Sequence, residues 1–131
     1  MKTAVTIARL LLGFIFLVFG LDFFLHFLEK LVTFPAIGPK ASDYLGALAN
    51  AGYFFPVLKS IEVVCGIFLL VNRYTALFIV VVFPIALNIF LFDVFLATSL
   101  LFLGGGILVL NLFLAYAYRK NYGGLVANQI I

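Results

Sequence analysis

Four long apolar runs dominate the chain, and short polar or proline-containing segments separate them. They predict helical spans at about residues 3–31, 55–72, 74–92 and 100–118. An α-helix rises about 1.5 Å per residue, so roughly 20 residues cross the ~30 Å hydrocarbon core of a bilayer. Residues 74–118 are too long for one span, and we expect the turn between the third and fourth spans within Asp93 to Ser99. The pattern therefore predicts an all-α integral membrane four-helix bundle, with one domain over residues 1–131.

Residues 33–54 form the long segment between the first and second spans. The stretch TFPAIGPK contains two prolines and a glycine and is typical of a loop. Ser42 or Asp43 can then cap a short helix, and Gly52 can end it. We expect this helix to lie at the membrane interface or to cap the mouth of the bundle, as a connector or as a lid over a pocket. Residues 121–131 show little periodicity and are expected to form a mobile tail.

The composition supports a membrane protein. Hydrophobic residues make up 66% of the chain and charged residues only 10%, and the mean hydropathy is +1.31. Globular proteins are about 45–50% apolar and about 25% charged, so this chain has too few polar residues to cover a water-facing surface. The net charge of +3 is small and no basic run is present, so we predict no nucleic-acid partner.

Cysteine and histidine usage exclude several chemistries. Cys65 is the only cysteine, so the chain can form no intramolecular disulfide and no CxxC redox pair. It lies within a span, where a free cysteine usually packs as a small hydrophobic residue. His26 is the only histidine, so one chain cannot supply two axial histidines to a haem. Because HExxH and paired-histidine spacings are also missing, we predict neither a metal site nor a catalytic motif.

Four spans place both termini on one side of the membrane, and the cations divide unevenly between the two sides. The terminal side would hold Lys2, Arg9, Arg73, Arg119 and Lys120, and the other side Lys30, Lys40 and Lys59. Five cations against three favour cytoplasmic termini under the positive-inside rule. Lys2 and Arg9 precede an apolar stretch, as in a secretory signal peptide. No A-x-A-like site follows and the apolar pattern continues, so we expect a retained helix.

Ionisable and amide side chains inside the apolar runs mark candidate functional positions. Glu62 lies in the run KSIEVVCGIFLLVNR. In a regular helix it is about 16 Å from Arg73, which marks the inner boundary of the membrane. A charge at that depth usually faces a partner or a cavity. Arg9 enters the first span from the inner side, and its long side chain can reach inward. We therefore predict an Arg9–Glu62 pair, with Asn88 or Asn111 completing its hydrogen bonds.

Two interpretations of these polar groups remain open. They either only fasten helices together, at about 1 kcal/mol or less per polar contact, or they line a polar intramembrane pocket. Such a pocket would open toward the outer side near His26 and Asp93 and could bind a quinone or another amphipathic small molecule. Asp22, His26 and Glu29 share a helical face and could equally be a wetted helix end. The candidate ligand-binding residues are Glu62, Arg9, Asn88, His26, Asp93 and Asn111.

Several segments resemble the DoxX family of membrane proteins. IARLLLGFIFLVFGL at 7–21 is similar to the start of that family, and GALANAGYFFPVLKSIEVVCGIFLLVNRY at 46–74 resembles its second-helix region. PIALNIFLF at 84–92 and LNLFLAYAYRKNY at 110–122 continue the match over nearly the whole chain. The resemblance implies a four-helix membrane bundle. Many similar sequences carry His after NIFLF, where this chain has Asp93, so no metal or proton-transfer role is carried over to that position.

The resemblance implies an accessory membrane function. DoxX relatives include the quinone-interacting DoxD-type subunit of thiosulfate:quinone oxidoreductase, and proteins that act as membrane partners or assembly factors. Arg9, Glu62 and Asn88 lie in the matching motifs. We expect an accessory subunit of the bacterial inner membrane that binds quinone or another lipophilic molecule near Glu62, with a separate redox protein supplying electrons. The alternative is a membrane chaperone or assembly partner with purely structural polar residues. A transporter, which would require a homo-oligomer, comes third.

Overall fold

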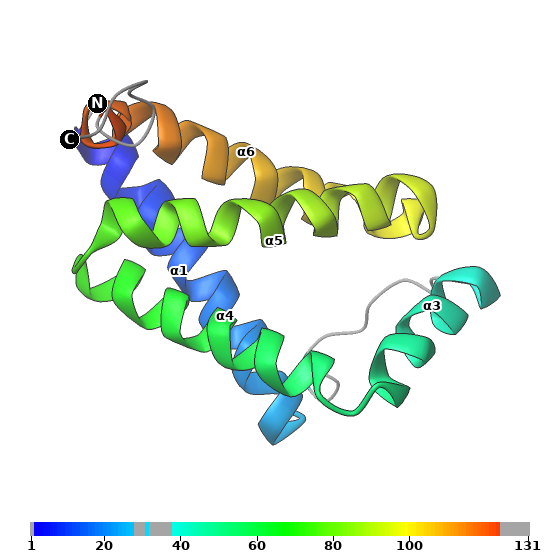
Figure 1. The fold of residues 1–131 in the computed structure, drawn as a ribbon. Helices are drawn as coiled ribbons and strands as arrows, with labels where there is room; N and C mark the ends of the chain where they lie inside the picture. Colours follow the sequence, from blue (N-terminus) through cyan, green and yellow to red (C-terminus); the bar gives the residue numbers. More distant parts are fainter. Residues whose placement is uncertain (1, 28–30, 32–37, 124–131) are drawn as a thin grey trace.

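A computed structural model describes residues 2–27, 31 and 38–123 of the chain (Figure 1). Its helices are α1 (Lys2–Leu25), α3 (Pro39–Asn50), α4 (Phe54–Val71), α5 (Thr75–Phe95) and α6 (Leu101–Ala117), with 3-10 turns η1 (Thr98–Leu100) and η2 (Arg119–Tyr122). The helices α1, α4 and α5 and the segment Thr98–Ala117 are each long and apolar enough to cross a membrane. The structure confirms the predicted all-α four-helix membrane bundle with a short helix between the first two spans. Glu29, Lys30 and the predicted tail beyond Gly123 lie outside the described residues.

The first spanning helix is shorter than the apolar pattern predicts. It ends at Leu25, although apolar residues continue toward residue 31. His26 adopts a left-handed backbone conformation with φ of 53°, and its backbone N–H donates to the Asp22 carbonyl at 2.7 Å. A left-handed residue stops the right-handed path of a helix, so backbone conformation rather than hydropathy sets this end.

The short helix α3 begins earlier than the predicted cap at Ser42 or Asp43. Its first residue is Pro39, and the preceding Gly38 has a φ of 87°. Glycine adopts positive φ without steric cost, and proline suits a first helical turn because its missing N–H would have had no partner there. The backbone at Gly52, with φ of 88°, follows the end of the helix, in line with the predicted stop.

The spanning helices form two antiparallel pairs. α1 packs most closely against α4, and α5 against α6, whereas the contacts between the two pairs are less extensive. The start of α1 and the end of α6 lie at one end of the bundle, and there the pairs approach each other (Figure 1). Toward the other end the pairs diverge, and α3 lies at that wider end (Figure 1). The divergence leaves room for side chains of α3 to reach between the pairs.

Glycines allow α1 and α4 to approach closely. A Cβ atom on Gly20 would lie 2.7 Å from Val63 Cγ2, and one on Gly13 would lie 3.1 Å from the Gly66 carbonyl oxygen. A Cβ atom on Gly66 would meet backbone directly, 2.6 Å from the Leu17 nitrogen. Small residues increase van der Waals contact between membrane helices, and this contact replaces the hydrophobic driving force that is lost in lipid.

The core is apolar, and so are the outward faces of the spanning helices. The buried core cluster consists of Ala8, Leu12, Phe16, Cys65, Leu69, Ile79, Val82, Ala86, Ile107 and Leu114. Large apolar side chains are nevertheless exposed on every spanning helix, among them Phe14, Val64, Leu77 and Phe102. Exposed apolar surface on this scale is unfavourable in water and favourable in lipid. The arrangement therefore fits a bilayer environment.

A tyrosine ties the C-terminal turn to the start of α5. The hydroxyl of Tyr122 in η2 donates to the Ala76 carbonyl at 2.8 Å. Burial, and to a smaller extent the neighbouring Tyr118, raises the pKa of the Tyr122 hydroxyl. This bond holds η2 against the end of the bundle where the two helix pairs meet.

Candidate functional site

Glu62 is a buried carboxylate in the middle of α4. Only 3% of its surface is exposed. Its Oε1 atom lies 3.4 Å from Nζ of Lys59, which precedes it by one helical turn, so the two residues form an i, i+3 ion pair. An isolated charge among spanning helices is costly, and such charges pair or face a cavity. Lys59 provides that partner from the same helix.

The predicted Arg9–Glu62 pair is wrong. The Arg9 guanidinium instead donates to the carbonyls of Leu69 and Leu70, the latter at 3.1 Å. These carbonyls belong to the last turn of α4, which lacks intrahelical donors and carries the negative end of the helix dipole. In the antiparallel α1/α4 pair Arg9 is level with this last turn, whereas Glu62 lies about 10 Å farther along the axis. Arg9 therefore caps α4 across the helix interface.

Asn111 fastens α6 to α5 and does not bond to Glu62. It is fully buried, and its side-chain amide donates to the Ile79 carbonyl at 3.1 Å. Pro84 lies inside α5 and lacks a backbone N–H, which weakens the helix turn before it. The accepting carbonyl of Ile79 lies just before that turn. The Oδ1 atom of Asn111 is buried without a hydrogen-bond partner. The fastening interpretation thus holds for this residue.

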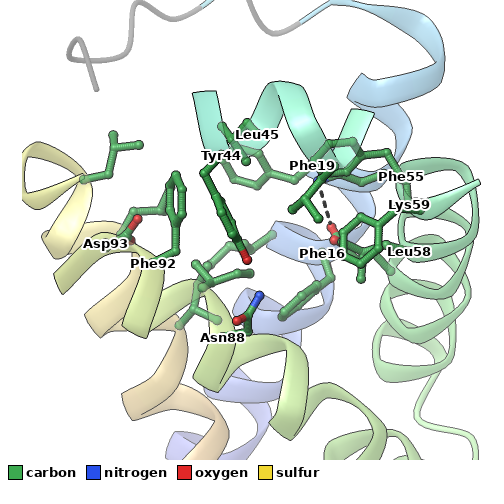
Figure 2. A pocket seen from close by; sticks show the side chains of 18 residues that line it. Phe16, Phe19, Tyr44, Leu45, Phe55, Leu58, Lys59, Asn88, Phe92 and Asp93 are labelled. Atoms are coloured by element: carbon green, nitrogen blue, oxygen red, sulfur yellow. Dashed lines mark hydrogen bonds and ion pairs between the residues drawn. The ribbon is translucent and has the colours of Figure 1, made fainter. Parts of the chain in front are cut away.

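A cavity of about 220 Å³ lies between the two helix pairs at the end where they diverge (Figure 2). All four spanning helices contribute to its walls, and α3 contributes Tyr44, Leu45 and Leu48. The Tyr44 ring lies 5.6 Å from the Phe92 ring. Figure 2 shows the hydroxyl end of Tyr44 pointing into the cavity toward Asn88. The short helix therefore covers part of the mouth, as the predicted cap over the bundle would.

The cavity walls are mainly apolar and aromatic, with a few polar groups. The aromatic residues of the lining are Phe16, Phe19, Tyr44, Phe54, Phe55 and Phe92. Its charged and amide side chains are Lys59, Glu62, Asn88 and Asp93. Small-molecule sites have this composition: apolar and aromatic walls supply contact area, and a small number of polar groups orient the ligand.

Asp93 is the second buried carboxylate of the lining. It is 2% exposed and lies near the end of α5. Its carboxylate packs against Gly104 of α6, whose backbone is its hydrogen-bond partner, and a Cβ atom at position 104 would collide with it. The Oδ2 atom is buried without a hydrogen-bond partner. Proximity to the start of α6 favours a negative charge here, because the helix dipole is positive at that end.

The structure brings together half of the predicted ligand-binding set. The members that line the cavity are Glu62, Asn88 and Asp93. Arg9 caps α4, Asn111 lies in the α5/α6 interface, and His26 is exposed just beyond α1. The polar groups of the spans therefore divide into helix fasteners at one end of the bundle and a cavity lining at the other.

Sequence reasoning missed Lys59 and Tyr44 as members of the site. Lys59 and Glu62 are three residues apart on one face of a helix, and this spacing was a usable signal for an ion pair. No comparable signal identifies Tyr44. A tyrosine near a span boundary is expected to face the lipid head groups, and only the position of α3 turns it inward.

The described residues contain no group of three or more His, Cys, Asp or Glu side chains that could hold a metal ion.

Comparison of the chain with protein-family models, with curated proteins and with solved structures finds no match. The fold and the cavity define the class: a helical membrane protein with a partly polar cavity between its spanning helices.

Proposed function

We propose that this chain is a DoxX-like accessory membrane protein that binds a lipophilic small molecule in the cavity beside Glu62. The observation that carries the proposal is the partly buried Lys59–Glu62 pair in the wall of a mainly apolar cavity. Helix fastening alone does not require a cavity beside the charges, and ionisable groups within spanning helices commonly mark ligand or ion sites.

Quinone is the first candidate ligand, because the sequence resembles a family with quinone-interacting members. An engineered protein cavity of about 150 Å³ holds benzene, so about 220 Å³ is enough for a substituted ring. The aromatic walls would stack on that ring. The Lys59 ammonium, the Asn88 amide and the Tyr44 hydroxyl are donors that could bond to its carbonyls. The tail of the ligand would extend into the bilayer.

The orientation and partner follow from charge and resemblance. Lys2, Arg73, Arg119 and Lys120 lie at the end of the bundle where the helix pairs meet. The positive-inside rule favours a cytoplasmic location for that end, and the cavity would then lie in the outer half of a bacterial inner membrane. In this role the chain contributes the quinone side of an oxidoreductase, and a separate redox protein supplies the electrons.

The test combines purification with ligand binding. Gentle extraction from the native membrane, followed by mass spectrometry, is expected to recover a quinone or another lipophilic ligand with the protein. Added quinone is expected to raise the thermal unfolding midpoint. Glu62→Gln should weaken quinone binding about fivefold, because Lys59 loses its anionic partner and its position. Asp43→Asn removes an exposed carboxylate outside the cavity and should leave binding unchanged.

Two outcomes would contradict ligand binding. A co-purifying membrane protein, without any ligand-dependent stabilisation, would identify a chaperone or assembly partner instead. Recovery of bulk lipid alone, with neither ligand nor protein partner, would remove the support for both functions.

A further inference from the structure

The charged groups of the cavity do not balance. Glu62 and Asp93 contribute two carboxylates, and Lys59 contributes the one cation of the described lining. Lys59 is paired with Glu62 at 3.4 Å. Asp93 therefore has no cationic partner among the described residues, and the cavity carries an excess of one formal negative charge.

Asp93 also has an unused hydrogen-bond acceptor. Its Oδ2 atom is buried without a hydrogen-bond partner, and only 2% of the surface of the residue is exposed. A buried polar atom without a hydrogen-bond partner is unfavourable, and a charged one more so. A cation in the cavity would compensate the buried negative charge of this carboxylate, whereas a ligand that brings only acceptors would not.

The aromatic lining offers a second attraction for positive charge. Six aromatic side chains face a volume of about 220 Å³. The face of an aromatic ring is electronegative and attracts ammonium groups, most strongly where water is excluded. The ring centroids of Tyr44 and Phe92 lie 5.6 Å apart. Phe92 directly precedes Asp93 in α5, and Tyr44 approaches it from α3. Aromatic faces and a surplus carboxylate are the combination that binds organic ammonium ions.

We propose that the preferred ligand is a lipophilic amine in its protonated form, with the ammonium group beside Asp93 and the aromatic rings, and the apolar tail in the bilayer. This inference rests on the proposed function, since it names the ligand class of the same cavity. A quinone presents acceptors to Asp93 and leaves the excess charge in place. An organic ammonium ion supplies the missing positive charge.

The experiment compares two probes that differ only in the head group. 4-Octylbenzylamine is protonated at neutral pH, and 4-octylbenzyl alcohol has the same ring and tail without the charge. Each probe is titrated into the purified protein in phosphatidylcholine nanodiscs, and the thermal unfolding midpoint gives the apparent affinity. A lipophilic quinone is titrated in parallel. The amine is expected to bind at least about tenfold more tightly than the alcohol.

Charge variants assign the preference to the cavity. Asp93→Asn is expected to reduce the amine-to-alcohol affinity ratio to near one. Glu62→Gln removes a cavity charge without disturbing the contact of Asp93 with Gly104, and it should also lower the ratio if Asp93→Asn fails to fold. Asp43→Asn removes the same charge from an exposed position of α3, outside the lining, and should keep the wild-type ratio.

The possible results separate this inference from the proposed function. Equal binding of amine and alcohol, or tighter binding of quinone than of amine, would overturn the ligand class while leaving the cavity as a binding site. An amine preference that survives in both Asp93→Asn and Glu62→Gln would also overturn it. No stabilisation by amine, alcohol or quinone would overturn the proposed function itself.

Discussion

Gly66→Ala tests the close packing of α1 on α4, which forms one wall of the cavity. A Cβ atom at this position would lie 2.6 Å from the Leu17 nitrogen and 2.7 Å from the Gly13 carbonyl oxygen. Both neighbours are backbone atoms, so no side-chain rotation can make room. The two helices must separate by about 0.8 Å before the shorter distance reaches the 3.4 Å of an ordinary contact.

The size of the effect follows from two opposing terms. A radial gap of about 0.5–1 Å forfeits a quarter to a half of the dispersion energy of each contact. Overpacking of this kind costs about 1–3 kcal/mol. Alanine is the better helix former by about 1 kcal/mol, which offsets part of the loss. We expect the free energy of unfolding to fall by up to about 2 kcal/mol.

The measurement is SDS-induced unfolding of the protein in mild detergent, followed by far-UV circular dichroism. Gly106→Ala is the matched control, because it makes the same change in α6 where the new Cβ meets nothing within 4 Å apart from its chain neighbours and its own helix backbone. That variant should be as stable as the wild type or up to about 1 kcal/mol more stable. If Gly66→Ala were as stable as Gly106→Ala, the close α1/α4 interface at this glycine would be refuted.

Two further changes test contacts at the other end of the bundle. Arg9→Gln removes the charged donor from the Leu69 and Leu70 carbonyls and should lower the free energy of unfolding by about 1–3 kcal/mol in the same assay. Wild-type stability of this variant would contradict the cap. Tyr122→Phe removes the hydroxyl that bonds to Ala76. Because burial raises the pKa of Tyr122, the folded protein holds this proton more tightly than the unfolded chain, so the contribution is complete below about pH 10 and is lost as pH rises further. The stability difference between wild type and Tyr122→Phe should therefore shrink in alkaline buffer, and a difference independent of pH would count against this bond.

The spans and the close contact at Gly13 and Gly20 could be predicted, because both depend on local properties. An apolar run of about 20 residues has few stable arrangements other than a spanning helix, since lipid cannot satisfy its backbone polar groups. Glycines seven residues apart return to the same helical face whatever lies opposite. The end of α1 was less predictable, because the left-handed conformation of His26 interrupts a pattern that remains apolar.

The partners of the polar residues could not be predicted in the same way. Approximate depth in the membrane favours an Arg9–Glu62 pair, but the register of α1 on α4 places Arg9 beside Leu69 and Leu70 instead. Register depends on which side chains interlock between two helices, and hydropathy along one helix carries no information about it. The pairing of Glu62 with Lys59 could be predicted from the sequence, since the two residues are three positions apart on the same helix.

The amino-acid sequence alone was sufficient to predict the membrane bundle and to select six polar candidate residues, among them Glu62, Asn88 and Asp93. Tertiary structure decided which of them share a cavity. The two helix pairs diverge toward α3, and this divergence turns Tyr44 inward and leaves the Asp93 carboxylate in the lining with one unpaired oxygen. The tilt between packed helices comes from the summed contacts of many side chains, so a single polar residue, however conspicuous in its apolar run, does not reveal what it faces.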